Sequence, residues 1–180
     1  MEANVSQDER DEVDDIVAQW TRERPDLDAA AIGVFGRITR LNAAQRAVLR
    51  QVHERHGLTL ASFDVLANLR RSGAPHRKTA GELAESSLLT SGGITFRLDK
   101  MEADGLIRRT RSKEDRRVVY AELTELGLGK IDAVFADHLA TEQAMLGLLD
   151  AHEQAMLASL LRRLSASVAS FQAEPLVESD

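Results

Sequence analysis

Six cationic side chains lie within twelve consecutive residues, positions 107 to 118. They are Arg108, Arg109, Arg111, Lys113, Arg116 and Arg117. Only Glu114 and Asp115 oppose them, so this stretch has a formal charge of +4, whereas the whole chain has −6. Lysine and arginine neutralise phosphate groups whatever the base sequence of a nucleic acid. The remainder, at −10, keeps the protein soluble and discourages non-specific wrapping of DNA.

Three short helices precede this run, and two strands enclose it. We expect the helices at residues 60–71, 80–86 and 91–104, and the strands at residues 106–111 and 118–123. Capping side chains open each helix: Thr59, Thr79 in a capping box with Glu82, and Thr90. This order predicts a winged helix-turn-helix with the hairpin as its wing. The alternative is a merely solvated hairpin, but the position of the charge after a helix-turn-helix argues against it.

The third short helix has two distinct faces. At 100° per residue, Ile94, Leu98 and Met101 fall on the core side, and the opposite side carries Gly92, Phe96, Asp99, Lys100 and Ala103. The second helix of a helix-turn-helix enters the major groove. We therefore expect DNA contacts from ten residues of this helix and the wing: Thr90, Ser91, Gly92, Thr95, Phe96, Lys100, Arg111, Lys113, Arg116 and Arg117.

Long amphipathic helices flank the winged region. We expect them at residues 9–24, 28–56, 125–149 and 151–171, the last opened by a capping box of Asp150 and Glu153. Their apolar stripes exceed what a small core can cover, which predicts a helical dimer interface. The fold class is mainly α with a small β-hairpin wing. The expected divisions are 1–8 disordered, 9–58 dimerisation and ligand binding, 59–124 DNA binding, 125–173 dimerisation, and 174–180 disordered.

The sequence contains no pattern typical of an enzyme, a metal site or a bound cofactor. It has no Cys, and the spacing of its five His fits no metal-binding motif. No apolar run approaches the roughly 18 residues of a transmembrane helix, and the acidic N-terminus is unlike a signal peptide. We therefore expect a cytoplasmic protein without a membrane partner.

The stretch RLDKMEADGLIRRTRSKEDRRVVYAELTELG closely resembles the MarR family of bacterial transcriptional regulators. The resemblance covers about residues 30–170 and includes the Asp-x-Arg wing motif of that family, here Asp115 to Arg117. It implies that Arg117 reaches into the minor groove and that Asp115 orients the wing through an ion pair. It also implies a homodimer on a pseudo-palindromic DNA operator.

The extra N-terminal helix resembles the PecS-type, urate-responsive branch of that family. Four ligand-site residues define that branch, and this chain has the expected type at each: Trp20, Asp64, Arg97 and Arg109. The resemblance implies a repressor released by urate or a related anionic purine. An indole can stack on a planar ring, and two guanidinium groups can clamp an anion. Arg109 shares a strand face with Ile107, so we expect it to point inward.

Each of these residues also has a simpler interpretation. Trp20 could be core, Asp64 and Arg97 a structural ion pair, and Arg109 one more phosphate contact. Two arginines suit an organic polyacid such as citrate equally well, so a polyacid effector stays open. A winged-helix module for protein interaction, without DNA binding, is the remaining alternative.

Overall fold

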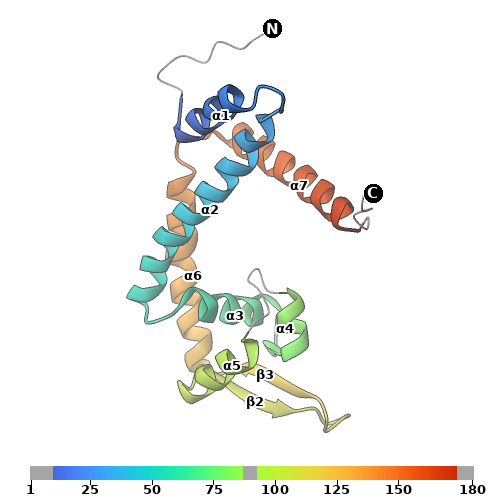
Figure 1. Cartoon of the computed structure of the whole chain (residues 1–180). Coiled ribbons are helices and arrows are strands. Elements are labelled where there is room, and N and C mark those ends of the chain that lie inside the picture. Colours follow the sequence, from blue (N-terminus) through green and yellow to red (C-terminus); the bar gives the residue numbers. More distant parts are fainter. Residues whose placement is uncertain (1–9, 87–92, 174–180) are drawn as a thin grey trace. The chain divides into compact units, whose positions relative to one another are not determined.

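The computed structural model describes residues 10–86 and 93–173 (Figure 1). The chain divides into two compact units, one ending at Val134 and one beginning at Phe135. The first unit contains α1 (Glu12–Glu23), α2 (Ala30–Arg55), α3 (Leu60–Arg71), β1 (Arg77–Thr79), α4 (Ala80–Ser86), α5 (Ile94–Ala103), β2 (Ile107–Arg111) and β3 (Val119–Leu123). Helix α6 (Glu125–Met145) begins in the first unit and ends in the second, which also contains α7 (Ala151–Ala173).

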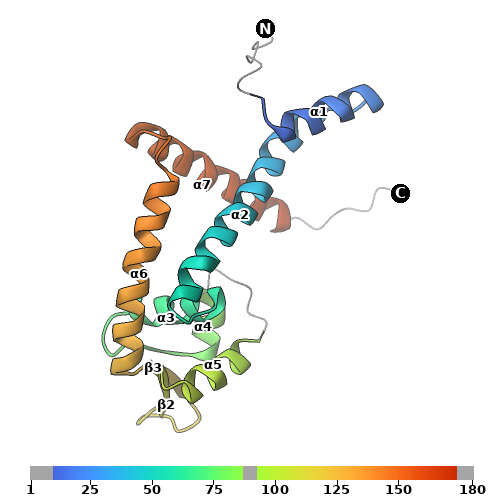
Figure 2. The ribbon, with the colours of Figure 1, turned by 90° about the vertical axis from the view of Figure 1, so that its left-hand side faces the viewer.

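Helix α1 packs across the first turns of α2, as both ribbon views show (Figures 1 and 2). Val13 is the buried anchor of α1, with 2% of its surface exposed. A Cβ atom at Gly36 would lie 3.0 Å from Val13 Cγ1, so the glycine lets the two helices approach closely. Ionic contacts reinforce this apolar contact at the start of α1, where Arg37 binds Asp11.

The predicted helix starts of the winged region are largely confirmed. Thr59 Oγ1 accepts the backbone N–H of Ser62, and Thr79 and Glu82 form the expected capping box. The capping box of Asp150 and Glu153 is also present. The predicted cap Thr90 lies outside the described residues. Within them, Gly93 with φ 78° precedes α5, a left-handed conformation that glycine adopts without strain.

The wing is a three-stranded antiparallel sheet in the order β1-β3-β2, not the two-stranded hairpin expected from the sequence. The additional strand β1 pairs Arg77 with Glu122 and Thr79 with Tyr120. Its segment is too short and too polar to show an alternating pattern, so a strand could not be predicted there from the sequence. The result is that β3 is the central strand, with partners on both edges.

One apolar core joins the helix-turn-helix to the sheet and to the start of α6. Its most deeply buried members include Leu66, Leu69, Leu83, Ile131 and Val134, each with no exposed surface. Leu98 and Met101 of α5 also belong to it, as their predicted inward face requires.

Gly127 fixes the contact between α6 and the wing. A Cβ atom there would lie 1.9 Å from the backbone oxygen of Leu106, so no side chain fits. Thr124 Oγ1 donates to the backbone oxygen of Gly105 at 2.7 Å and accepts the N–H of Gly127 at 3.0 Å. The base of the wing and the first turn of α6 are therefore locked together.

The second unit is helical and carries much exposed apolar surface. Its large exposed apolar side chains are Phe135, Leu139, Met145, Leu148, Met156, Leu157, Leu160, Leu161, Val168 and Phe171. Among the described side chains of α7 none is buried. Amphipathic helices with so little cover in one chain are typical of an intermolecular interface.

Candidate nucleic-acid interface and effector site

Helix α5 presents a polar and aromatic face to solvent. Phe96 has 74% of its surface exposed, and Thr95 and Lys100 are also exposed. The predicted DNA contacts Thr90, Ser91 and Gly92 lie outside the described residues. An exposed phenyl ring beside a hydroxyl and an ammonium group suits the thymine methyl groups and phosphates of a major groove.

Two of the six wing cations are paired with carboxylates of the same chain. Arg108 pairs with Glu122, and Arg109 pairs with Asp99 and Glu102. The other four, Arg111, Lys113, Arg116 and Arg117, are exposed, and in the part of the chain that the structure describes they form no ion pair. These four are the wing residues that the sequence analysis names as DNA contacts, and their contact with DNA stays a prediction. The free cations are those toward the tip of the wing.

The tip of the wing is shaped by short backbone contacts. Ser112 Oγ accepts the backbone N–H groups of Glu114 and Asp115, and the Asp115 carboxylate accepts the N–H of Arg117 at 2.9 Å. Within residues 10–86 and 93–173, Asp115 forms this hydrogen bond rather than an ion pair. It thus orients the backbone beside Arg117 and leaves that guanidinium free for another partner.

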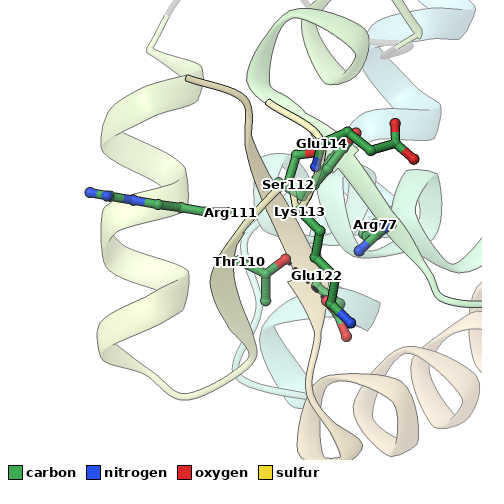
Figure 3. A pocket seen from close by; sticks show the side chains of 8 residues that line it. Arg77, Thr110, Arg111, Ser112, Lys113, Glu114 and Glu122 are labelled. Carbon is green, nitrogen blue, oxygen red and sulfur yellow. Dashed lines mark hydrogen bonds between the residues drawn. The ribbon is translucent and has the colours of Figure 1, made fainter. Parts of the chain in front are cut away.

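A hollow of about 430 Å³ lies on the outer face of the wing (Figure 3). The cross-strand register aligns Arg77, Glu122 and Arg108 in one row across the three strands. Glu122 has only 9% of its surface exposed, and it accepts hydrogen bonds from Arg108 and from Thr110 Oγ1. In Figure 3 the Lys113 side chain extends over the sheet toward Glu122, whereas Arg111 points away.

This row rigidifies the wing by neutralising a nearly buried carboxylate. The hydrogen bond from Arg108 is the main reason that the pKa of Glu122 lies below its ordinary value of 4.5. The guanidinium of Arg77 also stacks on the Tyr120 ring at 4.6 Å, a cation–π contact. Sequence reasoning missed Glu122 because an acid in a strand looks exposed until its neighbour strand β1 is known.

A second polar cluster joins α3, β1 and the C-terminal end of α4. Asn68 is fully buried, and its side chain bonds Lys78 Nζ at 2.8 Å and Ser86 Oγ at 3.0 Å. Arg71 donates to the backbone oxygen of Ser86. Two cations thus meet the C-terminal end of α4, where they complement the helix dipole. The cluster fixes the last turn before residues 87–92.

The four predicted effector residues are distributed over four elements. Trp20 lies on α1 with 51% of its surface exposed, so the alternative that it belongs to the core does not hold in this chain. Asp64 on α3 is 8% exposed, and Arg97 on α5 is partly buried. Arg109 lies opposite Ala121 on the sheet face of Ile107, as expected. It is exposed rather than turned inward, however, because its guanidinium contacts Asp99 and Glu102 of α5.

Arg109 joins the wing to α5, the helix that is expected to enter the major groove and is called the recognition helix below. Its guanidinium donates to Asp99 at 2.5 Å and to Glu102 at 2.9 Å, while its backbone N–H donates to Glu102 at 3.0 Å. The hydrogen bond to Asp99 is the main reason that the pKa of Arg109 lies above its usual value. The sequence placed Asp99 on the DNA-facing side of α5 and gave it no partner.

Metal and membrane features are absent from the described residues. No group of three or more His, Asp or Glu side chains in residues 10–86 and 93–173 is arranged to hold a metal ion. Nor is any described helix both long enough and apolar enough to cross a bilayer.

The winged sheet, the exposed face of α5 and the free cations of the wing define a winged-helix DNA-binding protein. A family model described as the MarR family matches residues 56–118. Over 153 residues the chain is 35% identical to the HTH-type transcriptional regulator PecS of Dickeya dadantii, across 85% of this chain and 92% of that protein. The chain belongs to the MarR family and is a DNA-binding transcriptional regulator, not an enzyme.

Two further proteins are similar. The HTH-type transcriptional regulator MhqR of Bacillus subtilis is 34% identical over 122 residues, 68% of this chain and 81% of its own. The crystal structure of AbsC, a MarR family regulator from Streptomyces coelicolor, matches with a TM-score of 0.68 at 23% identity, over 79% of this chain and 95% of that chain. The second likeness supports the fold alone.

Proposed function

We propose that this regulator is a repressor that binds a pseudo-palindromic operator as a homodimer and is released by urate or a related anionic purine. The observation that carries the effector part is the position of Arg109, which lies on β2 while its guanidinium contacts α5. An anion that takes this guanidinium acts directly on the contact between the wing and the helix that reads DNA. Differential binding of that kind is what allows a ligand to shift an equilibrium.

The exposure of Trp20, which has 51% of its surface accessible, favours a planar ligand. An indole offers a flat π surface on which a purine can stack, and a guanidinium offers paired donors for its anionic edge. Arg97 and Asp64 supply a second guanidinium and an acceptor for a ring N–H on neighbouring helices. A polyacid such as citrate is the second candidate, because its carboxylates suit the same two arginines.

The homodimer is supported by apolar surface on the outer helices. Val34, Phe35 and Leu41 of α2 are about half-exposed or more, and α6 beyond Val134 and α7 carry a further set. We assign dimerisation to residues 9–58 and 125–173. Analytical ultracentrifugation at micromolar concentration should give a dimer without DNA, and a monomer there would contradict the assignment.

The effector is tested by titrating the DNA complex with candidate anions. A fluorescent DNA fragment from upstream of the regulator's own gene reports binding through its anisotropy. Urate should release the fragment, citrate should not, and the fluorescence of Trp20, the only Trp, should be quenched over the same urate range. A typical coupling of about 1–3 kcal/mol corresponds to roughly a 5–150-fold loss of DNA affinity.

Three outcomes separate the candidates. Release by urate with quenching of Trp20 supports the purine effector. Release by citrate alone favours the polyacid, and an unchanged DNA affinity with both ligands overturns the effector proposal while leaving the DNA-binding function intact. The variant Trp20→Phe is tested with both anions. If the indole stacks on the purine, the variant should respond less to urate, and its response to citrate should not change.

A further inference from the structure

Two carboxylates of the recognition helix hold Arg109. Glu102 uses both of its oxygens, Oε1 for the backbone N–H of Arg109 at 3.0 Å and Oε2 for its guanidinium at 2.9 Å. Asp99 Oδ1 accepts from the other terminal nitrogen of the guanidinium at 2.5 Å. Residues three apart share one face of a helix, so Asp99 and Glu102 form a two-pronged acidic clamp on one side of α5.

The clamp opposes the approach of another anion. A guanidinium has five N–H donors in a fixed fork, and here each terminal nitrogen donates one hydrogen bond to a carboxylate. An anion that approached the same group would meet the negative charges of Asp99 and Glu102, and like charges repel. An effector anion therefore binds Arg109 more favourably when at least one carboxylate has moved away.

We propose that Asp99 and Glu102 are positioning residues that compete, from within the chain, with the effector anion for Arg109. The clamp holds the wing against α5 in the DNA-binding state and sets the effector concentration at which the operator is released. This proposal rests on the proposed function, because it takes Arg109 as part of the effector site. Neither acid needs to touch the DNA or the effector.

The competition has a thermodynamic signature. When only the state with an open clamp binds the effector, the apparent dissociation constant is the intrinsic one divided by the fraction of open molecules. A weaker clamp raises that fraction, so the effector binds more tightly. The same change depletes the DNA-binding state, so the operator binds less tightly. A residue with a merely structural role would weaken both.

The test variant is Glu102→Gln, which keeps an oxygen that can accept the N–H of Arg109 and removes only the charge. The pair is partly exposed, with 35% of the Arg109 side chain and 38% of the Glu102 side chain accessible, so we expect changes of about twofold to fivefold. Urate affinity, measured by quenching of Trp20 without DNA, should rise by that factor. Operator affinity, measured without urate, should fall. Asp99→Asn should change both affinities in the same directions.

Asp104→Asn is the matched control. Asp104 immediately follows α5 and forms no ion pair with any described residue, so its substitution removes one negative charge without touching the clamp. On electrostatic grounds alone, loss of an acid near DNA strengthens DNA binding. The control should therefore raise operator affinity slightly and leave urate affinity unchanged, opposite to the expected effect of Glu102→Gln on the operator.

The outcomes distinguish this proposal from the function on which it rests. If the unmodified protein neither binds urate nor is released by it, the proposed effector fails and the clamp proposal falls with it. If the unmodified protein responds, but Glu102→Gln and Asp99→Asn weaken both affinities or leave both unchanged, the clamp is overturned and the effector stands. Thermal unfolding of each variant identifies a general loss of structure, and Asp99→Asn keeps the test decisive if Glu102→Gln unfolds.

Discussion

The guanidinium of Arg37 on α2 binds both carboxylate oxygens of Asp11, the residue that caps α1. The two distances are 2.9 and 3.0 Å, and the same guanidinium contacts Asp14 at 2.8 Å. Asp11 and Asp14 form the capping box of α1, so one arginine holds both members of that box. This contact is the main reason that the pKa of Arg37 lies above its usual value, Asp14 contributing most.

Arg37→Ala should loosen α1. Loss of the Arg37 contacts leaves the apolar packing around Val13 and the ion pair between Arg40 and Glu12 to hold the helix against α2. The fluorescence anisotropy of Trp20 should fall, and proteolysis between α1 and α2 should become faster. Arg50→Ala, on the exposed side of α2 and without an ion pair in the described chain, is the control and should change neither signal.

Gly127→Ala and Gly129→Ala should have opposite effects on stability. The methyl group at 127 would lie 1.9 Å from a backbone oxygen, whereas at 129 it would meet nothing within 4 Å. Overpacking typically costs about 1–3 kcal/mol, and a clash with backbone belongs at the upper end of that range. At 129, alanine gains up to about 1 kcal/mol of helix propensity. Urea unfolding of both variants measures the difference, and equal values would show that α6 does not approach the wing base closely.

Arg117→Ala should weaken operator binding and leave the oligomeric state unchanged. Arg117 is exposed at the wing tip and lies outside the helices assigned to dimerisation. Loss of one phosphate contact should lower the slope of log K against log salt by about 1 per protomer. Anisotropy measured over a salt series gives that slope. An unchanged slope and affinity would remove Arg117 from the DNA interface.

Arg97→Ala should impair the response to urate more than it impairs DNA binding. Arg97 is partly buried on α5, away from the exposed face that carries Phe96. The measurement compares operator affinity with and without urate for the variant and for the unmodified protein. A variant that lost the operator yet kept normal quenching of Trp20 would assign Arg97 to DNA instead.

Acid should weaken the wing through Glu122. Its pKa is lowered in the folded state, chiefly by Arg108, so the carboxylate stabilises the fold at pH values above its unfolded pKa. That contribution is lost as the pH falls below about 4.5 and through the lowered pKa. Glu122→Gln should flatten the dependence of unfolding free energy on pH in this window. Equal slopes for the variant and the unmodified protein would mean that Glu122 gains nothing from its arginines.

Local capping patterns correctly predicted the starts of α3, α4 and α7, because a cap and its partner lie within four residues of each other. Thr59, Thr79 with Glu82, and Asp150 with Glu153 all act as their spacing predicts. Strand β1 could not be found this way. Its three residues are recognisable only from their pairing with β3, more than forty positions later in the chain.

The same limit applies to the site. Helical periodicity correctly turned Leu98 and Met101 toward the core and Phe96 toward solvent. It also placed Asp99 on the solvent side. Periodicity within one helix does not show, however, which side chain of another element contacts Asp99. The partner is Arg109 of β2, and the choice between a phosphate and a carboxylate partner for that arginine depends on tertiary contacts alone.

The close contact at Gly127 means that the two ends of α6 are under different evolutionary constraints. The first turns of α6 are constrained by the wing and by the buried residues Ile131 and Val134, so they can change little without loss of the DNA-binding fold. Beyond Phe135 the exposed apolar side chains are constrained, in the proposed homodimer, by contacts with the partner chain. Duplicated copies of such a gene can therefore diverge in partner choice while keeping the same operator, and related regulators in one cell can avoid mixed dimers.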